Sequence, residues 1–116
     1  MNAFNVIEYL KKEPFDIDEF LVMICRAELL SREEEQALVI KAHQGDDEAM
    51  SQLLCANACF VTNLASQYQG KGTSMQELLN VGMLALRNAV MEYDVHSEDS
   101  LIKFAVPQMR KALEKM

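Results

Sequence analysis

The spacing of apolar residues along this chain predicts a structure built from helices. Over most of the sequence, apolar side chains recur every three or four residues, which is the period of one face of an α-helix. Strict alternation of apolar and polar residues, typical of strands, is weak, and the four glycines do not form the pairs that favour hairpin turns. We therefore expect an all-α fold of about five helices.

Helix-capping residues place the boundaries of the predicted helices. Ser31 followed by Glu34 forms a capping box, and Gly45 would end the helix that starts there. A second helix starts at Asp46, and its apolar stripe continues at helical spacing to Gly70. The pattern therefore predicts one long central helix between Asp46 and Gly70.

The next helix begins at a second capping box, formed by Ser74 and Glu77. One side of this helix is apolar and predicted to be buried: Leu78, Leu79, Gly82, Leu86, Ala89, Val90 and Tyr93. The other side carries Gln76, Asn80, Met83, Arg87 and Met91. We expect Met83 and Met91 to be exposed methionines on an otherwise polar surface.

Further segments near both ends complete the predicted fold. Helical spacing favours a short helix over residues 6–12, another over about residues 16–26, and a last helix from about Asp99. Pro107 would kink that last helix unless the helix starts just before it, because proline lacks the backbone N–H that an interior position needs. The residues predicted to be buried together are Leu54, Val61, Leu64, Leu78, Leu79, Leu86, Val90 and Phe104.

Composition and charge limit the functions to consider. The chain has 116 residues, half of them hydrophobic, and a formal net charge of -7, which suits a single globular domain. The negative charge is concentrated before Ser51 and the later part is neutral, so clustered cations for autonomous DNA binding are missing. No apolar run is as long as a membrane span, and the start lacks a signal-peptide pattern. We therefore expect a cytoplasmic protein.

The three cysteines leave alternatives open. An odd number without an export signal favours reduced thiols over a disulfide framework. Cys55 and Cys59 are four residues apart and predicted to point outward, where they could bind zinc or sense oxidants. His43 or His96 could add metal ligands from elsewhere in the chain. The simpler alternative is that both thiols pack against a neighbouring helix, and Cys25 is expected in the core.

No pattern typical of catalysis is present. The sequence has no serine or cysteine beside a placed histidine, no glycine-rich phosphate loop and no paired carboxylates at an evident cleft. We therefore expect no enzyme, no cofactor and no small-molecule substrate. The acidic run from Glu33 to Glu35 could bind a basic partner, but acids are also the preferred residues at a helix N-terminus.

The order and spacing of several motifs resemble the bacterial sigma factor family. The motifs are Leu29 to Glu35, Gly45-Asp46, Ala56-Asn57, Tyr68 to Gly72, Glu77 to Leu79 and Tyr93-Asp94. Ahead of them, Phe20-Leu21, Ile24 and Arg26 are similar to the conserved segment before the family's second region. The resemblance implies a single domain in which residues 1–28 correspond to region 1.2 and residues 29–116 to region 2.

The resemblance implies a transcription module that docks on the clamp helices of RNA polymerase and, in the family, separates the promoter strands. Its partner would be core RNA polymerase or a sigma regulator. The resemblance places the contact on Gln76, Asn80, Met83 and Arg87. One alternative is a helical interaction module that shares the fold and binds another protein, and a less favoured one is a thiol-based metal or redox sensor.

The segment that would melt promoter DNA departs from the family pattern. Phe104 stands where the family has a tyrosine, and Pro107-Gln108 replaces a pair of tryptophans. Such aromatic side chains stack on unpaired bases, each stack contributing about 1–3 kcal/mol. Arg110, Lys111 and Lys115 leave a small cationic cluster, and the sequence does not continue into the family's basic recognition helix. We therefore expect promoter DNA binding to be weak or lost.

Overall fold

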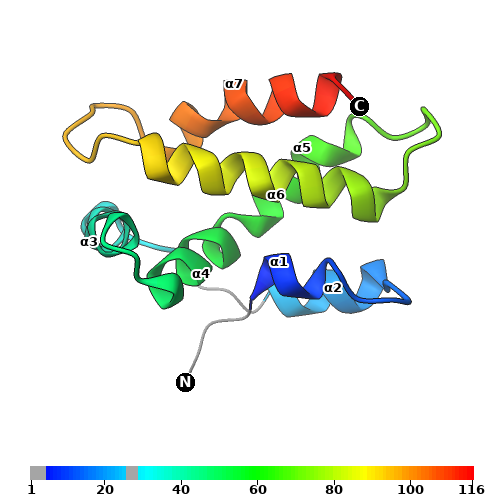
Figure 1. Ribbon diagram of the computed structural model, residues 1–116, viewed down its shortest axis with the longest axis horizontal. Coiled ribbons are helices and arrows are strands. Elements are labelled where there is room, and N and C mark those ends of the chain that lie inside the picture. The colour runs from blue at the N-terminus through cyan, green and yellow to red at the C-terminus, as the bar shows by residue number, and fades with distance from the viewer. Residues whose placement is uncertain (1–4, 26–28) are drawn as a thin grey trace.

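The structure, a computed structural model, describes residues 5–25 and 29–116, and these form seven helices and no strand (Figure 1). The helices are α1 (Val6–Tyr9), α2 (Ile17–Cys25), α3 (Arg32–His43), α4 (Asp47–Ala56), α5 (Ala58–Ser66), α6 (Met75–Glu92) and α7 (Leu101–Glu114). The predicted all-α fold is confirmed. None of the described helices is both long and apolar enough to cross a membrane.

The predicted capping box begins α3. The Ser31 hydroxyl accepts a hydrogen bond from the Glu34 amide (3.1 Å), and the Glu34 carboxylate accepts one from the Ser31 amide (3.0 Å). The hydrogen bond that the Ser31 amide donates to the carboxylate is the largest effect that lowers the pKa of Glu34. Gly45 follows the helix with a φ of 94°, a left-handed conformation that favours glycine. The predicted start and end of this helix are therefore confirmed.

The prediction of one long central helix is wrong, because the chain breaks at Asn57 into α4 and α5. The Asn57 side-chain amide donates a hydrogen bond to the Leu53 carbonyl (2.7 Å). This bond competes with the helical backbone ladder, and asparagine is prone to such local side-chain bonding. The backbone of Asn57 leaves the helical region at φ −105° and ψ 3°, and α5 begins at the next residue. Apolar spacing alone does not reveal the break, since three- and four-residue steps continue on both sides.

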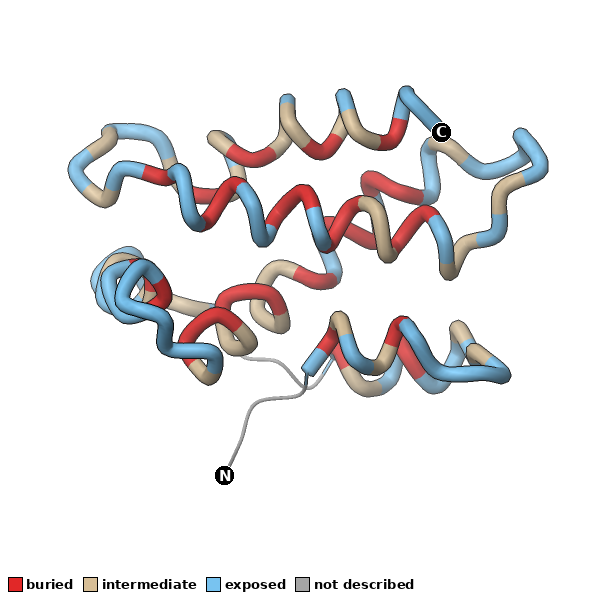
Figure 2. Tube along the Cα trace, viewed as in Figure 1, coloured by how far each residue is buried: buried red, intermediate tan, exposed pale blue. Residues whose placement is uncertain are grey.

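Helix α6 runs through the middle of the molecule and contacts α1, α3, α4, α5 and α7 (Figure 1). At the predicted start of α6, the Ser74 hydroxyl caps the helix by accepting a hydrogen bond from the Glu77 amide (3.2 Å). Figure 2 shows buried positions along most of its length. They are Leu78, Leu79, Gly82, Met83, Ala85, Leu86, Ala89 and Val90. Of the predicted core residues all are buried except Phe104, which is half-buried and packs against the same cluster.

Helix α7 lies antiparallel beside α6 and begins after its N-cap, Ser100 (Figure 1). Leu101, Ala105, Met109 and Leu113 are its buried residues, at four-residue steps that form one continuous stripe toward α6. The helix continues through Pro107, which is exposed. An exposed proline costs α7 one backbone hydrogen bond but displaces no core side chain.

Polar side chains of α3 hold the connection between α6 and α7 in place. The contacts are Arg32 Nη2 to the Ser97 carbonyl (2.8 Å), Gln36 Nε2 to the Val95 carbonyl (2.9 Å), Leu101 N to Glu35 Oε1 (3.3 Å) and His43 Nε2 to the Val90 carbonyl (2.7 Å). These bonds join the acidic N-terminal half of the chain to its neutral C-terminal half. The Glu35 carboxylate therefore accepts a hydrogen bond from the first residue of α7, so the acidic run from Glu33 to Glu35 is not wholly free for a partner.

The two N-terminal helices extend the core. Val6 and Leu10 from the α1 segment and Phe20 and Ile24 from α2 are buried in the same apolar cluster as α6. The rings of Phe15 and Phe20 lie 5.8 Å apart between centroids, a distance at which aromatic side chains attract. The α1 helix is shorter than predicted, because its regular part ends at Tyr9.

The closest approach between α5 and α6 occurs at Gly82. A Cβ atom built on Gly82 would lie 2.9 Å from Val61 Cγ1 of α5, closer than side-chain carbons pack. Val61 is fully buried and its β-branched side chain has few alternative rotamers. A side chain at residue 82 would therefore have to push the two helices apart.

We predict that Gly82→Ala destabilises the protein by about 1 kcal/mol, because overpacking (about 1–3 kcal/mol) outweighs the gain in helix propensity (about 1 kcal/mol). In a Val61→Ala background the clash disappears, and the same substitution should stabilise the fold. Urea denaturation of the four proteins of this double-mutant cycle measures both effects. An equal effect of Gly82→Ala in both backgrounds would contradict the proposed close contact.

Candidate protein interface on helix α6

The other helices leave one strip of α6 uncovered. An α-helix turns about 100° per residue, so the buried positions of α6 occupy somewhat less than half of its circumference. The middle of the opposite side carries Asn80, Leu84, Arg87, Asn88 and Met91, and we call this strip the α6 face. All of these residues are exposed except Asn80, which is half-buried. Leu84 and Met91 keep 39% and 49% of their surface exposed, so this strip carries two large apolar side chains that solvent reaches.

The spacing of the α6 face is that of a helix that packs against another helix. Asn80, Leu84, Arg87 and Met91 follow one another at steps of four, three and four residues. This is the repeat with which one side of a coiled-coil helix meets its partner. An apolar pair bordered by amides and one cation also matches the composition of protein interfaces, where methionine and arginine are enriched.

The structure corrects the contact face predicted from the sequence. Met83 was expected to be exposed, but it is fully buried. Gln76 is half-buried, and its Nε2 donates to the backbone carbonyls of Leu10 (2.8 Å) and Lys12 (3.1 Å). Gln76 therefore anchors the α1 segment to α6. Asn80 and Arg87 are the two residues of the predicted set that lie on the α6 face.

The prediction placed Met83 and Gln76 on the surface because it assumed that a single layer of helices covers the apolar stripe of α6. In the structure α1, α3 and α4 also pack on α6 and form a second layer beside that stripe. That layer covers the side that carries Gln76 and Met83. The uncovered strip of α6 is therefore centred nearer to Leu84 than the sequence predicted, and the prediction did not include Leu84. The sequence signal that could have identified Leu84 was its position as an apolar residue on the otherwise polar side of the helix.

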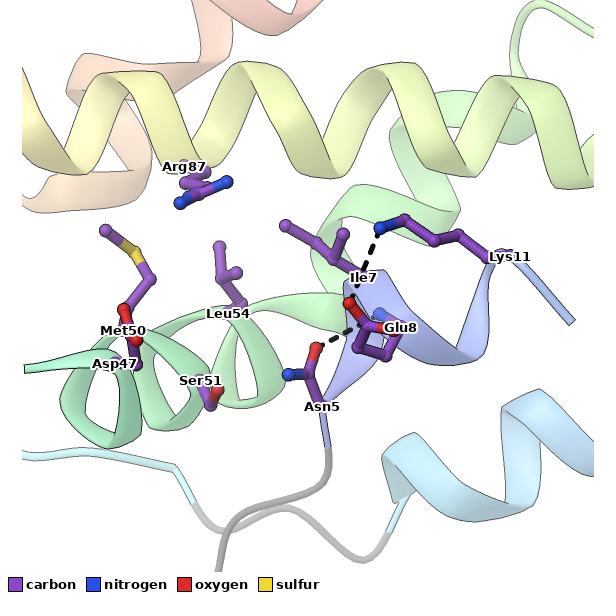
Figure 3. Close-up of a pocket in the computed structure, with 9 residues that line it drawn as sticks. All are labelled: Asn5, Ile7, Glu8, Lys11, Asp47, Met50, Ser51, Leu54 and Arg87. Carbon is purple, nitrogen blue, oxygen red and sulfur yellow. Dashed lines mark hydrogen bonds and ion pairs between the residues drawn. The ribbon is translucent and has the colours of Figure 1, made fainter.

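Arg87 borders a cavity of about 250 Å³ between α1, α4 and α6 (Figure 3). The cavity is lined by Asn5, Ile7, Glu8, Lys11, Asp47, Met50, Ser51, Leu54 and Arg87. In Figure 3 Arg87 extends from α6 over the α4 residues Met50 and Leu54, while Lys11 is paired with Glu8 (3.4 Å). Arg87 forms no salt bridge with any residue that the structure describes. Its guanidinium can therefore pair with a carboxylate of another molecule.

On its other side the α6 face borders a groove between α6 and α7. This groove encloses about 660 Å³ and is lined by Val81, Leu84, Ala85, Asn88, Glu92, Gln108, Lys111, Ala112 and Lys115. Four of its lining residues are apolar (Val81, Leu84, Ala85 and Ala112), and two lysines line it from the end of α7. The α6 face thus lies between a cavity with an arginine and a groove with two lysines.

Two of the three residues expected to face nucleic acid, Phe104 and Arg110, make contacts within the protein. Phe104 packs its ring against Tyr93, with 5.6 Å between centroids. Arg110 Nη1 donates to Gln67 Oε1 (3.2 Å) and to the Tyr68 hydroxyl (3.4 Å), which ties it to the end of α5. Lys111 is exposed in the groove beside α6. The ring and one of the two cations are therefore engaged within the protein.

No known protein-family profile matches the chain. The chain is similar to the RNA polymerase sigma factor SigA of Listeria monocytogenes and to that of Listeria innocua, each at 32% identity over 94 residues. The aligned part covers 81% of this chain. This chain therefore contains a sigma-factor-like region. It spans only 25% of the length of either relative, so the match concerns one part of those proteins.

The structure contradicts the prediction for Cys25 and confirms the outward position predicted for Cys59. Cys25 was expected in the core but is exposed, while Cys55 is half-buried and Cys59 is exposed. The break at Asn57 places Cys55 and Cys59 on different helices. His43 contacts the Val90 carbonyl, and no group of three or more possible metal ligands occurs among the described residues. Zinc binding by Cys55 and Cys59 with a histidine therefore has no support in this geometry.

We predict that Met83→Glu destabilises the fold strongly and that Met91→Glu hardly affects it. An unpaired charge at the fully buried Met83 should destabilise the sigma-like region by about 3–5 kcal/mol. The same change at the exposed Met91 should alter stability by less than about 0.5 kcal/mol. Thermal unfolding followed by circular dichroism measures both, and equal losses of stability would mean that the α6 face is placed wrongly.

Proposed function

We propose that the sigma-like region acts in transcription and binds core RNA polymerase through the α6 face. The single observation that carries this proposal is the repeat of half-buried Asn80 and exposed Leu84, Arg87 and Met91 on the helix where the family resemblance places polymerase contact. The clamp of the polymerase presents paired helices to sigma factors, and a helix with this repeat fits such a partner.

The chemistry of the α6 face favours a partner helix with an apolar centre and an acidic edge. Leu84 and Met91 lie on the same side of α6, about two turns apart, and can insert between apolar side chains of the partner. Arg87 lies at one border of the face without a salt-bridge partner in the described residues, and a partner carboxylate there would form a charge-assisted hydrogen bond. Asn80 and Asn88 supply further donors and acceptors around the apolar pair.

We further propose that the sigma-like region has lost most of its ability to hold melted promoter DNA. Pro107 and Gln108 lie in the middle of α7, where neither can stack on a base. Phe104 is the nearest aromatic residue, and its ring is packed against Tyr93. Lys111 and Lys115 remain as exposed cations, but the chain is acidic as a whole, which weakens attraction to phosphate.

A second candidate function is binding to a sigma regulator or another helical protein. The exposed side chains of Leu84 and Met91 favour binding of such a protein as well, because the α6 face can pack against a helix of any partner. Retention on purified core RNA polymerase distinguishes the two candidates.

We predict that Leu84→Glu combined with Met91→Glu lowers affinity for immobilised core RNA polymerase by at least about tenfold, which corresponds to about 1.4 kcal/mol. The matched control is Ile40→Glu on α3, because Ile40 is an equally exposed apolar residue (46%) away from the α6 face. Circular dichroism confirms the folding of each variant. Unchanged retention of the double variant, or equal loss with the control, would place the partner surface elsewhere.

We predict that the unaltered protein shows no saturable binding to single-stranded promoter oligonucleotides at micromolar concentration and physiological salt. Introducing Pro107→Trp with Gln108→Trp should strengthen this binding about tenfold or more, since each stacked base contributes about 1–3 kcal/mol. Fluorescence anisotropy measures both proteins, with Lys103→Trp as a control for added aromatic surface. Sub-micromolar, sequence-selective binding by the unaltered protein would contradict the proposal.

A further inference from the structure

The groove between α6 and α7 has an apolar lining that another molecule can use. The two helices pack side by side in antiparallel directions, and the groove of about 660 Å³ lies between them (Figure 1). Ala85 of α6 and Ala112 of α7 are two of its lining residues, and Val81 and Leu84 add larger apolar side chains. Because the alanine side chains are short, apolar side chains of a partner can enter here without displacing a residue of this protein.

Charged side chains stand at the two ends of this groove. Lys111 lies in the last turn of α7, and Lys115 is the C-cap of the same helix, so four-residue spacing puts both on one side. Glu92 also lines the groove and is the last residue of α6. Because the end of α6 lies beside the start of α7, Glu92 and the two lysines are at opposite ends (Figure 1). From Val81 to Glu92 the groove follows α6 for about 16 Å.

These three charged side chains are free to pair with another molecule. Lys111, Lys115 and Glu92 are exposed, and none of them takes part in an ion pair among the residues that the structure describes. Lys103 of the same helix, by contrast, lies 3.5 Å from the Asp99 carboxylate. The groove therefore has a positive end and a negative end, separated by apolar side chains.

We propose that this groove binds an amphipathic helix of another protein, with acidic residues at one end of the helix and a basic residue at the other. The apolar side chains of that helix would contact Val81, Leu84 and Ala112, and its acids would pair with the two lysines. Apolar grooves are a recurring binding site for such helices. A bound helix would cover Leu84 and so compete with any partner at the α6 face. The proposal itself rests on the groove and not on the proposed polymerase contact.

Nucleic acid fits the same groove less well. No aromatic side chain lines it, so unpaired bases would have nothing to stack on. Glu92 would repel a phosphate at one end, and two lysines release few counterions. The acidic residues that precede Ser51 do not line the groove, and physiological salt screens exposed charges beyond about 8 Å. The local lysines and the apolar lining therefore favour an acidic helix.

The test titrates the full-length protein with a fluorescent helical peptide of about sixteen residues, held in shape by a side-chain staple. The peptide carries leucines at three- and four-residue steps, two glutamates at one end and an arginine at the other. A second peptide has lysines in place of the glutamates. Fluorescence anisotropy at physiological salt should show saturable binding of the glutamate peptide, at least about tenfold tighter than that of the lysine peptide. The net charge of -7 would by itself favour the opposite order.

Charge-reversed variants show whether the peptide lies in the groove. Lys111→Glu combined with Lys115→Glu should weaken binding of the glutamate peptide at least about tenfold and strengthen binding of the lysine peptide. The matched control, Lys41→Glu combined with Lys103→Glu, changes the net charge equally outside the groove lining and should alter binding by less than about twofold. Circular dichroism confirms the folding of each variant.

Four outcomes would each overturn the proposal. They are no saturable binding of the glutamate peptide, tighter binding of the lysine peptide to the unaltered protein, equal weakening by the two pairs of substitutions, and displacement of the glutamate peptide by a single-stranded oligonucleotide at the same concentration. The last outcome would assign the groove to nucleic acid.

Discussion

The burial of α6 is the constraint on which the rest of this structure depends. Five other helices contact α6, and its buried side forms the centre of the single described apolar cluster. Gly82 allows α5 to approach more closely than any side chain would permit. The four-residue stripe of α7 packs against α6, and α3 side chains bind the connection that precedes α7. Because each neighbour covers a defined arc, the position of the uncovered arc is also fixed.

Much of the fold follows from local sequence signals. Ser31 with Glu34 and Ser74 with Glu77 mark helix starts that the structure confirms, because a side-chain cap satisfies backbone donors wherever the chain continues. The Asn57 break was not predictable from apolar spacing, since it depends on one hydrogen bond between an amide and a carbonyl one turn back. The signal that could have located it was the asparagine itself, a weak helix former in an otherwise apolar stretch.

The candidate site was predicted less well than the fold, for a related reason. Which side of α6 is free depends on every helix that packs on it, and the covering of Met83 and Gln76 by the N-terminal layer is a long-range effect. Cys25 illustrates the same limit in the other direction, because an apolar helix led to an expectation of burial for a residue that lies at its exposed end. Periodicity identifies the faces of a helix, while tertiary contacts decide which face remains on the surface.

The proposed interface therefore depends on a geometric claim: a partner lies over Leu84 and Met91. Photocross-linking tests this claim most directly, with a photoreactive phenylalanine analogue placed at residue 84 and, as a control, at residue 40 on α3. In a complex with core RNA polymerase, the account predicts a covalent adduct between residue 84 and the polymerase clamp, and none from residue 40. An adduct from residue 40 without one from residue 84 would contradict it.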